Sequence, residues 1–189
     1  MKLIDSLISF KKTFGRQGND FGSFQINDTK FSNSNNLEDM YNIMLFNEPI
    51  VIGGEFSMDI YPQNELAEAQ RGWYTILSKD NQWIPDDAKW NKNWIVFATR
   101  DEDAIYYNEI DGGVYGSIEK EIFYKLSDSL SEFFHVLSEC MKMEETVFHF
   151  DTTDDEEETT DLFLEECQKI LSQNMSTKNA TDFMNFFFS

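Results

Sequence analysis

The side chains that most often carry catalysis are scarce in this chain. Its only histidines are His135 and His149, and its only cysteines are Cys140 and Cys167. A cysteine or serine nucleophile needs a base within hydrogen-bond reach, most often a histidine. The sequence contains no G-x-S-x-G or H-E-x-x-H motif and no Cys–His pairing, although a contact in space between His149 and a cysteine, as in a small hydrolase, stays open. We therefore predict a protein without catalytic residues.

Two further segments contain residue types that bind metals or phosphates. Residues 151–158 concentrate carboxylates, but they lack the spacing and the central glycine of a calcium-binding EF-hand loop, so we interpret them as a solvated linker. The glycine-bearing residues 15–22 lack the Lys-Ser/Thr of a phosphate-binding P-loop, and no predicted strand precedes them as a dinucleotide site requires. We predict neither a metal nor a cofactor.

The charge balance favours a particular kind of partner. The chain has 35 acidic and 15 basic side chains, a formal net charge of -20. This charge repels nucleic acid and anionic membranes and attracts basic proteins. Acidic composition also raises solubility in its own right, an alternative that charge alone leaves open. We expect no direct nucleic-acid or membrane contact.

The expected location follows from what the first residues and the apolar runs lack. Residues 1–14 have no continuous apolar stretch of the kind found in signal peptides, and no apolar run reaches transmembrane length. We predict a cytoplasmic protein, monomeric or homodimeric, in which Cys140 and Cys167 are reduced and face the core.

Aromatic residues surrounded by charge are typical of binding hot spots. Trp94 begins an apolar run and is expected to face the core, whereas Trp83 and Trp90 lie in a polar stretch, with core packing as their alternative. The nearby carboxylates fall in predicted turns, which lie at opposite ends of a meander and need not form one patch. The predicted partner contacts are Trp83, Asp86, Asp87, Trp90, Asp101, Glu102, Asp103, Glu109 and Asp111.

These residues belong to a predicted antiparallel meander. Residues 95–98, 104–107 and 113–117 are short β-prone runs separated by turns, which predicts three strands. A helix is predicted over residues 127–143, where apolar side chains recur at helical spacing. Ser129 and Glu132 form a capping-box pattern at its start.

Upstream, the pattern predicts further elements. A helix capped by Asn36 is expected to about residue 47, after an irregular or weakly paired segment over residues 15–36. Alternation over residues 56–60 predicts a strand, and residues 73–77 predict another, which brings the sheet to about five strands. We therefore predict an α+β fold, a twisted antiparallel sheet flanked by helices.

The composition changes after residue 143. Residues 144–161 are strongly acidic and predict a linker, which leads to an apolar helical stripe from Phe163 to Leu171 and a phenylalanine-rich tail. We predict a domain over residues 1–143 and a C-terminal helical extension over residues 144–189 that packs on it, with a homodimer seam or a partner-facing patch as alternatives for the tail.

The order of these segments resembles the SUKH superfamily of immunity proteins, which also includes a yeast regulator of cell-wall synthesis. The likeness covers residues 50–143 and rests on W-x3-W-I-V-F-A, then D-A-I-Y-Y, G-G-V-Y-G and S-L-S-E-F-F-x-x-L. Members typically act without catalysis by binding and neutralising a cognate toxin in the bacterial cytoplasm. The resemblance implies an immunity protein whose partner is a toxin, for which the negative charge favours a basic nuclease. The alternative is a regulatory scaffold unrelated to toxins.

Overall fold

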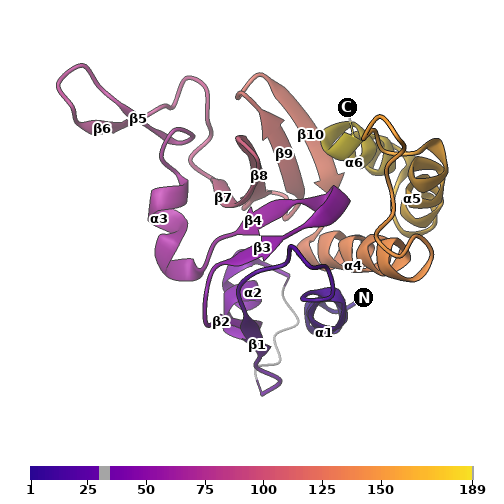
Figure 1. Cartoon of the computed structure of the whole chain (residues 1–189). Helices are drawn as coiled ribbons and strands as arrows, with labels where there is room; N and C mark the ends of the chain where they lie inside the picture. Colours follow the sequence, from indigo (N-terminus) through magenta and orange to yellow (C-terminus); the bar gives the residue numbers. More distant parts are fainter. Residues whose placement is uncertain (30–34, 189) are drawn as a thin grey trace.

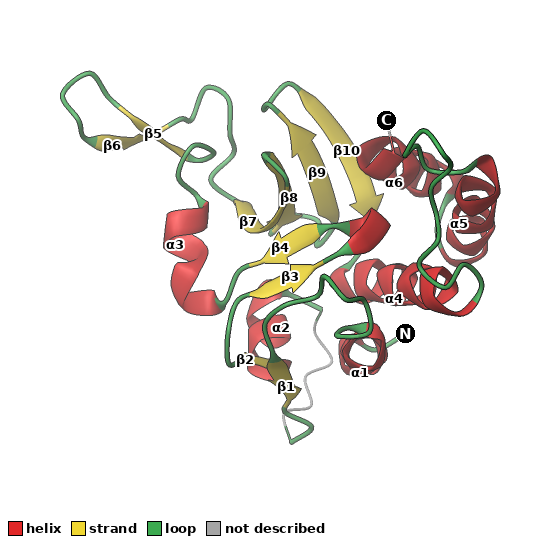
Figure 2. Ribbon diagram, in the orientation of Figure 1, coloured by secondary structure: helices red, strands yellow, loops and turns green. Residues whose placement is uncertain are grey.

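A six-stranded antiparallel sheet organises the computed structural model, which describes residues 1–29 and 35–188 (Figures 1 and 2). The strand order is β10-β9-β8-β7-β4-β3. The sheet comprises β3 (Ile50–Ile52), β4 (Met58–Ile60), β7 (Trp94–Arg100), β8 (Asp103–Asn108), β9 (Val114–Ile118) and β10 (Ile122–Ser127). Two small antiparallel pairs join β1 (Phe24–Ile26) with β2 (Met44–Phe46) and β5 (Thr75–Leu77) with β6 (Trp83–Pro85).

Helices flank this sheet, chiefly on one face, which confirms the predicted α+β class. They are α1 (Leu3–Thr13), α2 (Leu37–Ile43), α3 (Leu66–Ala69), α4 (Leu130–Thr146), α5 (Asp161–Asn174) and α6 (Thr177–Phe188), with 3-10 turns η1 (Gly54–Phe56) and η2 (Gln63–Glu65). The predicted N-caps of two helices are confirmed. The Asn36 side chain accepts a hydrogen bond from the Asp39 amide at 2.8 Å, and Ser129 Oγ accepts one from the Glu132 amide at 3.2 Å.

The meander has one strand more than the sequence predicted. Residues 122–127 form β10, which pairs with β9, and the helix that was predicted from residue 127 begins at Leu130. The β9–β10 turn is built from Glu119 and Lys120, which both have positive φ angles of 52° and 58°. Because neither residue is a glycine, no turn signal marked this hairpin in the sequence.

Two other predicted elements are corrected. Residues 44–46, expected at the end of a helix, leave it and form β2 opposite β1. Residues 75–77 do form a strand, but β5 belongs to a separate hairpin and not to the main sheet. Periodicity gives the direction of side chains but not the partner of a strand, and therefore it misplaced both segments. The predicted irregular segment over residues 15–36 falls partly outside the described residues.

One face of the sheet packs against helices and forms the larger core. Helix α1 packs along α4, and the rings of Phe10 and Phe134 lie 5.2 Å apart at their interface. Both side chains are fully buried, as are Phe97 of β7 and Ile105 of β8 on the sheet side. The amphipathic pattern of α1 and α4 thus explains why they cover this face.

The phenylalanine-rich residues of α6 pack on the same face. Phe183, Phe186 and Phe187 are buried, and a Cβ atom on Gly116 of β9 would lie 2.4 Å from the Phe186 ring. The absence of a side chain at position 116 therefore lets the helix approach the sheet. Beside it, the Asp182 carboxylate accepts a hydrogen bond from the Lys125 amide of β10 at 3.0 Å, so α6 also satisfies part of the sheet edge.

The predicted acidic linker begins later than the sequence indicated. Helix α4 continues to Thr146, and Glu144 is a buried residue of that helix. The loop that follows is tied to η1, because the Glu55 carboxylate accepts hydrogen bonds from Thr152 Oγ1 at 2.5 Å and from Thr159 Oγ1 at 2.9 Å. The loop is thus anchored at both ends, while the acidic side chains between these threonines are exposed.

Candidate functional site

The second face of the sheet carries a layer of aromatic rings. Trp94, Tyr106, Tyr115 and Phe123 come from four successive strands, and the Tyr106 ring stacks on Trp94 at 5.1 Å and on Tyr115 at 5.4 Å. This layer is covered by the chain that precedes β7 and not by a long helix. Phe123 remains 40% exposed, so the face is only partly closed.

Trp90 lies inside this aromatic layer. Its ring meets Tyr106 edge-on at 4.9 Å, its Nε1–H donates a hydrogen bond to the Trp94 carbonyl at 2.9 Å, and the residue is only 2% exposed. Trp90 is therefore a core residue, the alternative that the sequence left open. It offers a partner little surface, and it lines a shallow surface hollow together with Trp94 and residues 87–89 and 91–92.

Trp83 has the opposite environment. It lies on the β5–β6 hairpin, residues 75–85, which we name the arm because it projects away from the sheet (Figure 1). Trp83 is 47% exposed, and the Arg71 guanidinium lies 4.9 Å from the centre of its ring. Leu77 and Ile84 of the arm are similarly exposed, at 53% and 42%. The exposure of Trp83 is compatible with its predicted role as a partner contact, which stays a prediction, and the arm also exposes two apolar residues that the sequence analysis did not name.

The base of the arm is fixed to the sheet by an ion pair. The Lys120 ammonium in the β9–β10 turn lies 2.7 Å from the Asp86 carboxylate, and both side chains are almost buried. Asp86 was predicted as a partner contact, but its carboxylate is already occupied. Its neighbour Asp87 is exposed.

Carboxylates from the β7–β8 and β9–β10 turns and from the adjoining strands β4 and β8 gather at one end of the sheet, which we name the acidic end: Asp59, Asp101, Glu102, Asp103 and Glu119. Partial burial and then the negative charge of Asp101 raise the pKa of Asp59. The pKa of Asp103 is also raised, chiefly by burial. The Arg100 guanidinium lowers this pKa, whereas repulsion from Asp101 and Glu119 raises it. Burial is the main cause of both shifts, and the neighbouring carboxylates add a smaller repulsion at this end of the sheet.

Arg100 offsets the negative charge of the acidic end only in part, because its guanidinium lowers the pKa of Asp103 but also contacts α6. Its guanidinium donates a hydrogen bond to the Phe187 carbonyl at 2.6 Å and lies 5.5 Å from the Phe187 ring. The predicted contacts Asp101, Glu102 and Asp103 therefore lie together with Glu119, which the sequence analysis missed because it missed the β9–β10 turn.

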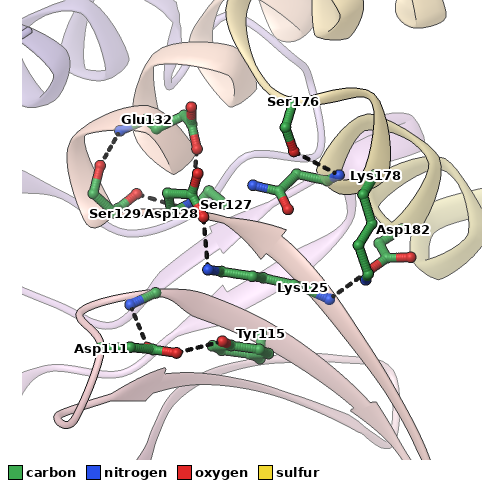
Figure 3. Close-up of polar contacts among 12 residues, drawn as sticks. Asp111, Tyr115, Lys125, Ser127, Asp128, Ser129, Glu132, Ser176, Lys178 and Asp182 are labelled. Carbon is green, nitrogen blue, oxygen red and sulfur yellow. Dashed lines mark hydrogen bonds and ion pairs between the residues drawn. The ribbon is translucent and has the colours of Figure 1, made fainter.

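The remaining predicted contacts, Glu109 and Asp111, lie in the β8–β9 turn at the opposite end, as a meander requires. Asp111 is exposed, and Figure 3 shows that its carboxylate is bound by groups of its own turn and strand. It accepts hydrogen bonds from the Gly113 amide at 3.0 Å and from the Tyr115 hydroxyl at 2.6 Å. These contacts give Asp111 a structural role in the turn.

The polar contacts around this turn leave each group in its ordinary charge state. Burial and the hydrogen bond to Asp111 raise the pKa of Tyr115. Lys125 Nζ and Asp128 Oδ1 lie 2.6 Å apart, and this ion pair, drawn in Figure 3, raises the pKa of the lysine and lowers that of the aspartate. A general acid or base needs a pKa moved toward neutrality, so these shifts are those of structural pairs.

The groups considered for catalysis are dispersed. His149 is exposed, whereas Cys140 and Cys167 are fully buried on α4 and α5. A hydrogen bond between the two thiols, together with burial, raises the pKa of Cys140 and makes it a poor nucleophile. Within residues 1–29 and 35–188, no group of three His, Cys, Asp or Glu side chains is placed to hold a metal ion.

One carboxyl has a pKa near neutrality, and it lies in the interior. Burial raises the pKa of Glu144 to about 7. Its Oε1 accepts only long hydrogen bonds, from the Glu55 amide at 3.3 Å and from Gln17 Nε2 at 3.4 Å. The side chain is buried against η1, where a Cβ on Gly54 would be 2.3 Å from Oε1, so the carboxyl faces packed protein.

Comparison with protein-family models, with curated proteins and with solved structures found no match for this chain. The resemblance to the SUKH superfamily therefore stays a prediction that rests on the residues quoted for it. In the described part of the chain, no helix is long and apolar enough to cross a membrane.

Proposed function

We propose that this protein is a non-catalytic binding protein whose acidic end holds a basic protein. The observation that carries the proposal is the gathering of Asp101, Asp103 and Glu119 from two turns, with Asp59 beside them, in a chain of net charge -20. Lysine and arginine side chains of a partner would relieve the repulsion among these carboxylates, and the negative field would accelerate encounter.

The resemblance to SUKH proteins names the class of partner. Under this proposal, the protein is a cytoplasmic immunity protein that occludes the active surface of a cognate bacterial toxin, and a basic nuclease suits the charge. A nuclease that binds a polyanionic substrate has a basic cleft, which an acidic surface complements. The second candidate, a regulatory scaffold, uses the same acidic end to bind a host protein.

Co-expression with the toxin encoded beside the gene tests the proposal. The wild-type protein is expected to rescue growth and to co-purify with the toxin. Charge reversal at the acidic end, with Asp101→Lys and Asp103→Lys combined, is expected to weaken binding at least ~10-fold, because charge pairs at interfaces typically contribute more than 1 kcal/mol each. Asp86 is left unchanged because it holds the arm through Lys120.

A matched control separates a local contact from a general charge effect. Glu109→Lys with Glu38→Lys changes the net charge by the same amount at two exposed positions near the opposite end of the sheet, where Glu109 and the neighbour of Glu38, Asp39, both lie close to Tyr107. If both double variants weaken binding equally, the net charge and not the acidic end recognises the partner. If the wild type rescues growth but forms no complex with the toxin, the protein does not act by occluding the toxin. If the neighbouring toxin is neither bound nor neutralised, the regulatory scaffold is the better explanation.

A further inference from the structure

Two adjoining hollows lie between the β2–β3 turn and η2. The larger, about 210 Å³, is lined by residues of α2, β2 and η2, and the smaller, about 120 Å³, by residues of the β2–β3 turn and η2. Phe46, Pro62 and Asn64 line both, so the hollows form one groove, which we name the η2 groove (residues 41, 44–49 and 62–65). Sites for drug-sized ligands usually measure about 300–1,000 Å³, so each hollow suits a single side chain.

The larger hollow is lined mainly by apolar side chains. The rings of Tyr41 and Phe46 lie 5.8 Å apart, and Met44 beside them is fully buried. Leu45, which lines the same hollow, is 44% exposed, and Pro62 completes the lining. An exposed apolar side chain beside a concave aromatic surface is typical of a site that receives an apolar side chain of a partner.

The smaller hollow has the opposite character, because it is lined by Glu48 and Glu65. Within residues 1–29 and 35–188, neither glutamate forms an ion pair. The segment that builds the groove is also uniformly acidic, since residues 35–70 contain seven acidic side chains and no lysine or arginine. A lysine or arginine side chain complements this hollow, whereas an acidic one is repelled.

The walls of the η2 groove are held by hydrogen bonds of the backbone. The amides of Asn47 and Glu48 both donate to the Ser23 carbonyl, at 2.9 and 3.2 Å, which fixes the β2–β3 turn. On the other side, the Glu65 amide donates to the Pro62 carbonyl at 2.9 Å and closes η2. A groove with walls that are already ordered binds a ligand at a smaller cost in conformational entropy.

We propose that the η2 groove binds an extended segment of a partner protein, in which an apolar side chain enters the larger hollow and a lysine or arginine enters the smaller one. The apolar lining and the two glutamates together favour this occupant, because a wholly apolar segment leaves both carboxylates unpaired. The inference does not depend on the proposed function, since no residue of the groove belongs to the acidic end and no toxin is required.

Nuclear magnetic resonance titration of the full chain tests the proposal with the peptide acetyl-Gly-Phe-Gly-Lys-Gly-amide. Its phenylalanine and lysine are two residues apart, so in an extended peptide they share one face. We expect saturable shifts of amide signals in residues 41–49 and 62–65, with a Kd of ~1 mM or lower. Replacing the lysine of the peptide by glutamate, or the phenylalanine by glycine, is expected to weaken binding at least ~10-fold. Equal binding of the glutamate peptide overturns the proposal, and so do shifts confined to the acidic end.

Two double variants separate the groove from the net charge. Glu48→Gln with Glu65→Gln is expected to weaken binding of the peptide at least ~10-fold, because it removes both carboxylates that pair with the lysine. Asp101→Asn with Asp103→Asn changes the net charge by the same amount at the acidic end and is the matched control. We expect it to change the Kd of the peptide by less than ~2-fold, since distant sites act nearly independently. Equal weakening by the two double variants overturns the proposal.

A third variant blocks the groove without changing its charge. Asn64 is exposed and lines both hollows, so the larger side chain in Asn64→Trp fills the space between them. We expect this variant to lose binding of the peptide at least ~10-fold, while amide signals outside the groove keep the positions that show an intact fold. Unchanged affinity in a folded Asn64→Trp variant overturns the proposal.

Discussion

The two faces of the six-stranded sheet are closed by different kinds of structure. On one face, helices supply phenylalanines such as Phe134 and Phe183 that reach zero exposure. On the other face, the chain before β7 lays Trp90 over Tyr106 and leaves Phe123 at the margin. A helix covers a strip of sheet continuously, whereas a loop covers it with single side chains. The first face thus sets the stability of the fold, and the second face leaves residues available for contact.

The largest expected effect lies on the helix-covered face. Phe134→Ala removes a ring that contacts both Phe10 at 5.2 Å and Phe133 at 5.5 Å. We expect a loss of ~3–5 kcal/mol in the free energy of unfolding, the usual cost of deleting a buried phenyl group. Urea denaturation followed by circular dichroism measures it. A loss below ~1 kcal/mol would show that the α1–α4 interface does not carry the stability of this face.

The second prediction concerns Glu144→Gln, which we expect to gain stability relative to the wild type as the pH rises. The raised pKa of Glu144, about 7 instead of 4.5, means that the folded state holds the proton more tightly than the unfolded state. The wild type therefore loses stability as pH rises from about 4.5 through 7, by an amount on the order of 3 kcal/mol. Glu144→Gln should be more stable than the wild type by about this amount at pH 8 and equal to it below pH 4.5.

The difference between Glu144→Gln and the wild type isolates this residue, because all other carboxyl groups titrate in both proteins. Thermal or urea unfolding at pH 4, 6 and 8 measures it. Glu145→Gln, one residue along α4 and partly exposed in an ion pair with Arg16, is the control. A constant difference across this pH range would mean that Glu144 is ionised throughout in the folded protein.

Sequence reasoning succeeded where local pattern decides the structure. The α+β class, the meander and the caps at Asn36 and Ser129 follow from alternation, spacing and side-chain hydrogen bonds that neighbouring residues make. It failed where the partner of a segment lies far away in the chain. The β5–β6 hairpin and the burial of Trp90 depend on contacts that no local pattern contains.

The candidate site was predicted only in part for the same reason. Asp101 and Asp103 were identified from their turn, but Glu119 and Asp59 join them only because β9 and β4 lie alongside in the sheet. The residues beside Trp90 in the sequence are polar because that loop is exposed, whereas the Trp90 ring itself is buried against Tyr106. A hydrophobic side chain in a polar segment therefore has two opposite interpretations until the fold is known.

A third prediction compares the loop-covered face directly with the helix-covered one. Trp90→Phe keeps an aromatic ring but removes the Nε1–H that bonds the Trp94 carbonyl. We expect a loss of ~2 kcal/mol in the free energy of unfolding, from one unsatisfied carbonyl and a smaller ring. Tryptophan fluorescence and urea denaturation report it. A loss as large as that of Phe134→Ala would abolish the distinction between the two faces.

The smallest expected effect concerns the base of the arm. Lys120→Met removes the partner of Asp86 while keeping much of the aliphatic side chain. We expect the global free energy of unfolding to fall by ~1 kcal/mol, less than the ~3–5 kcal/mol of a fully buried pair, because local opening of the arm lets water reach the Asp86 carboxylate. Amide exchange in residues 75–85 should accelerate for the same reason. Hydrogen exchange followed by mass spectrometry resolves this segment. Unchanged exchange in the arm would show that the ion pair does not hold it.

The packing of α6 against Gly116 and Tyr124 has a consequence for synthesis in the cell. The ribosome produces the chain from its N-terminus, so the strands emerge well before residues 177–188. During that interval the surface that Phe186 later covers is open to solvent and to holdase chaperones. This part of the core can therefore close only after α6 has left the ribosome. Nascent chains that pause before α6 should bind chaperones and should be sensitive to proteases.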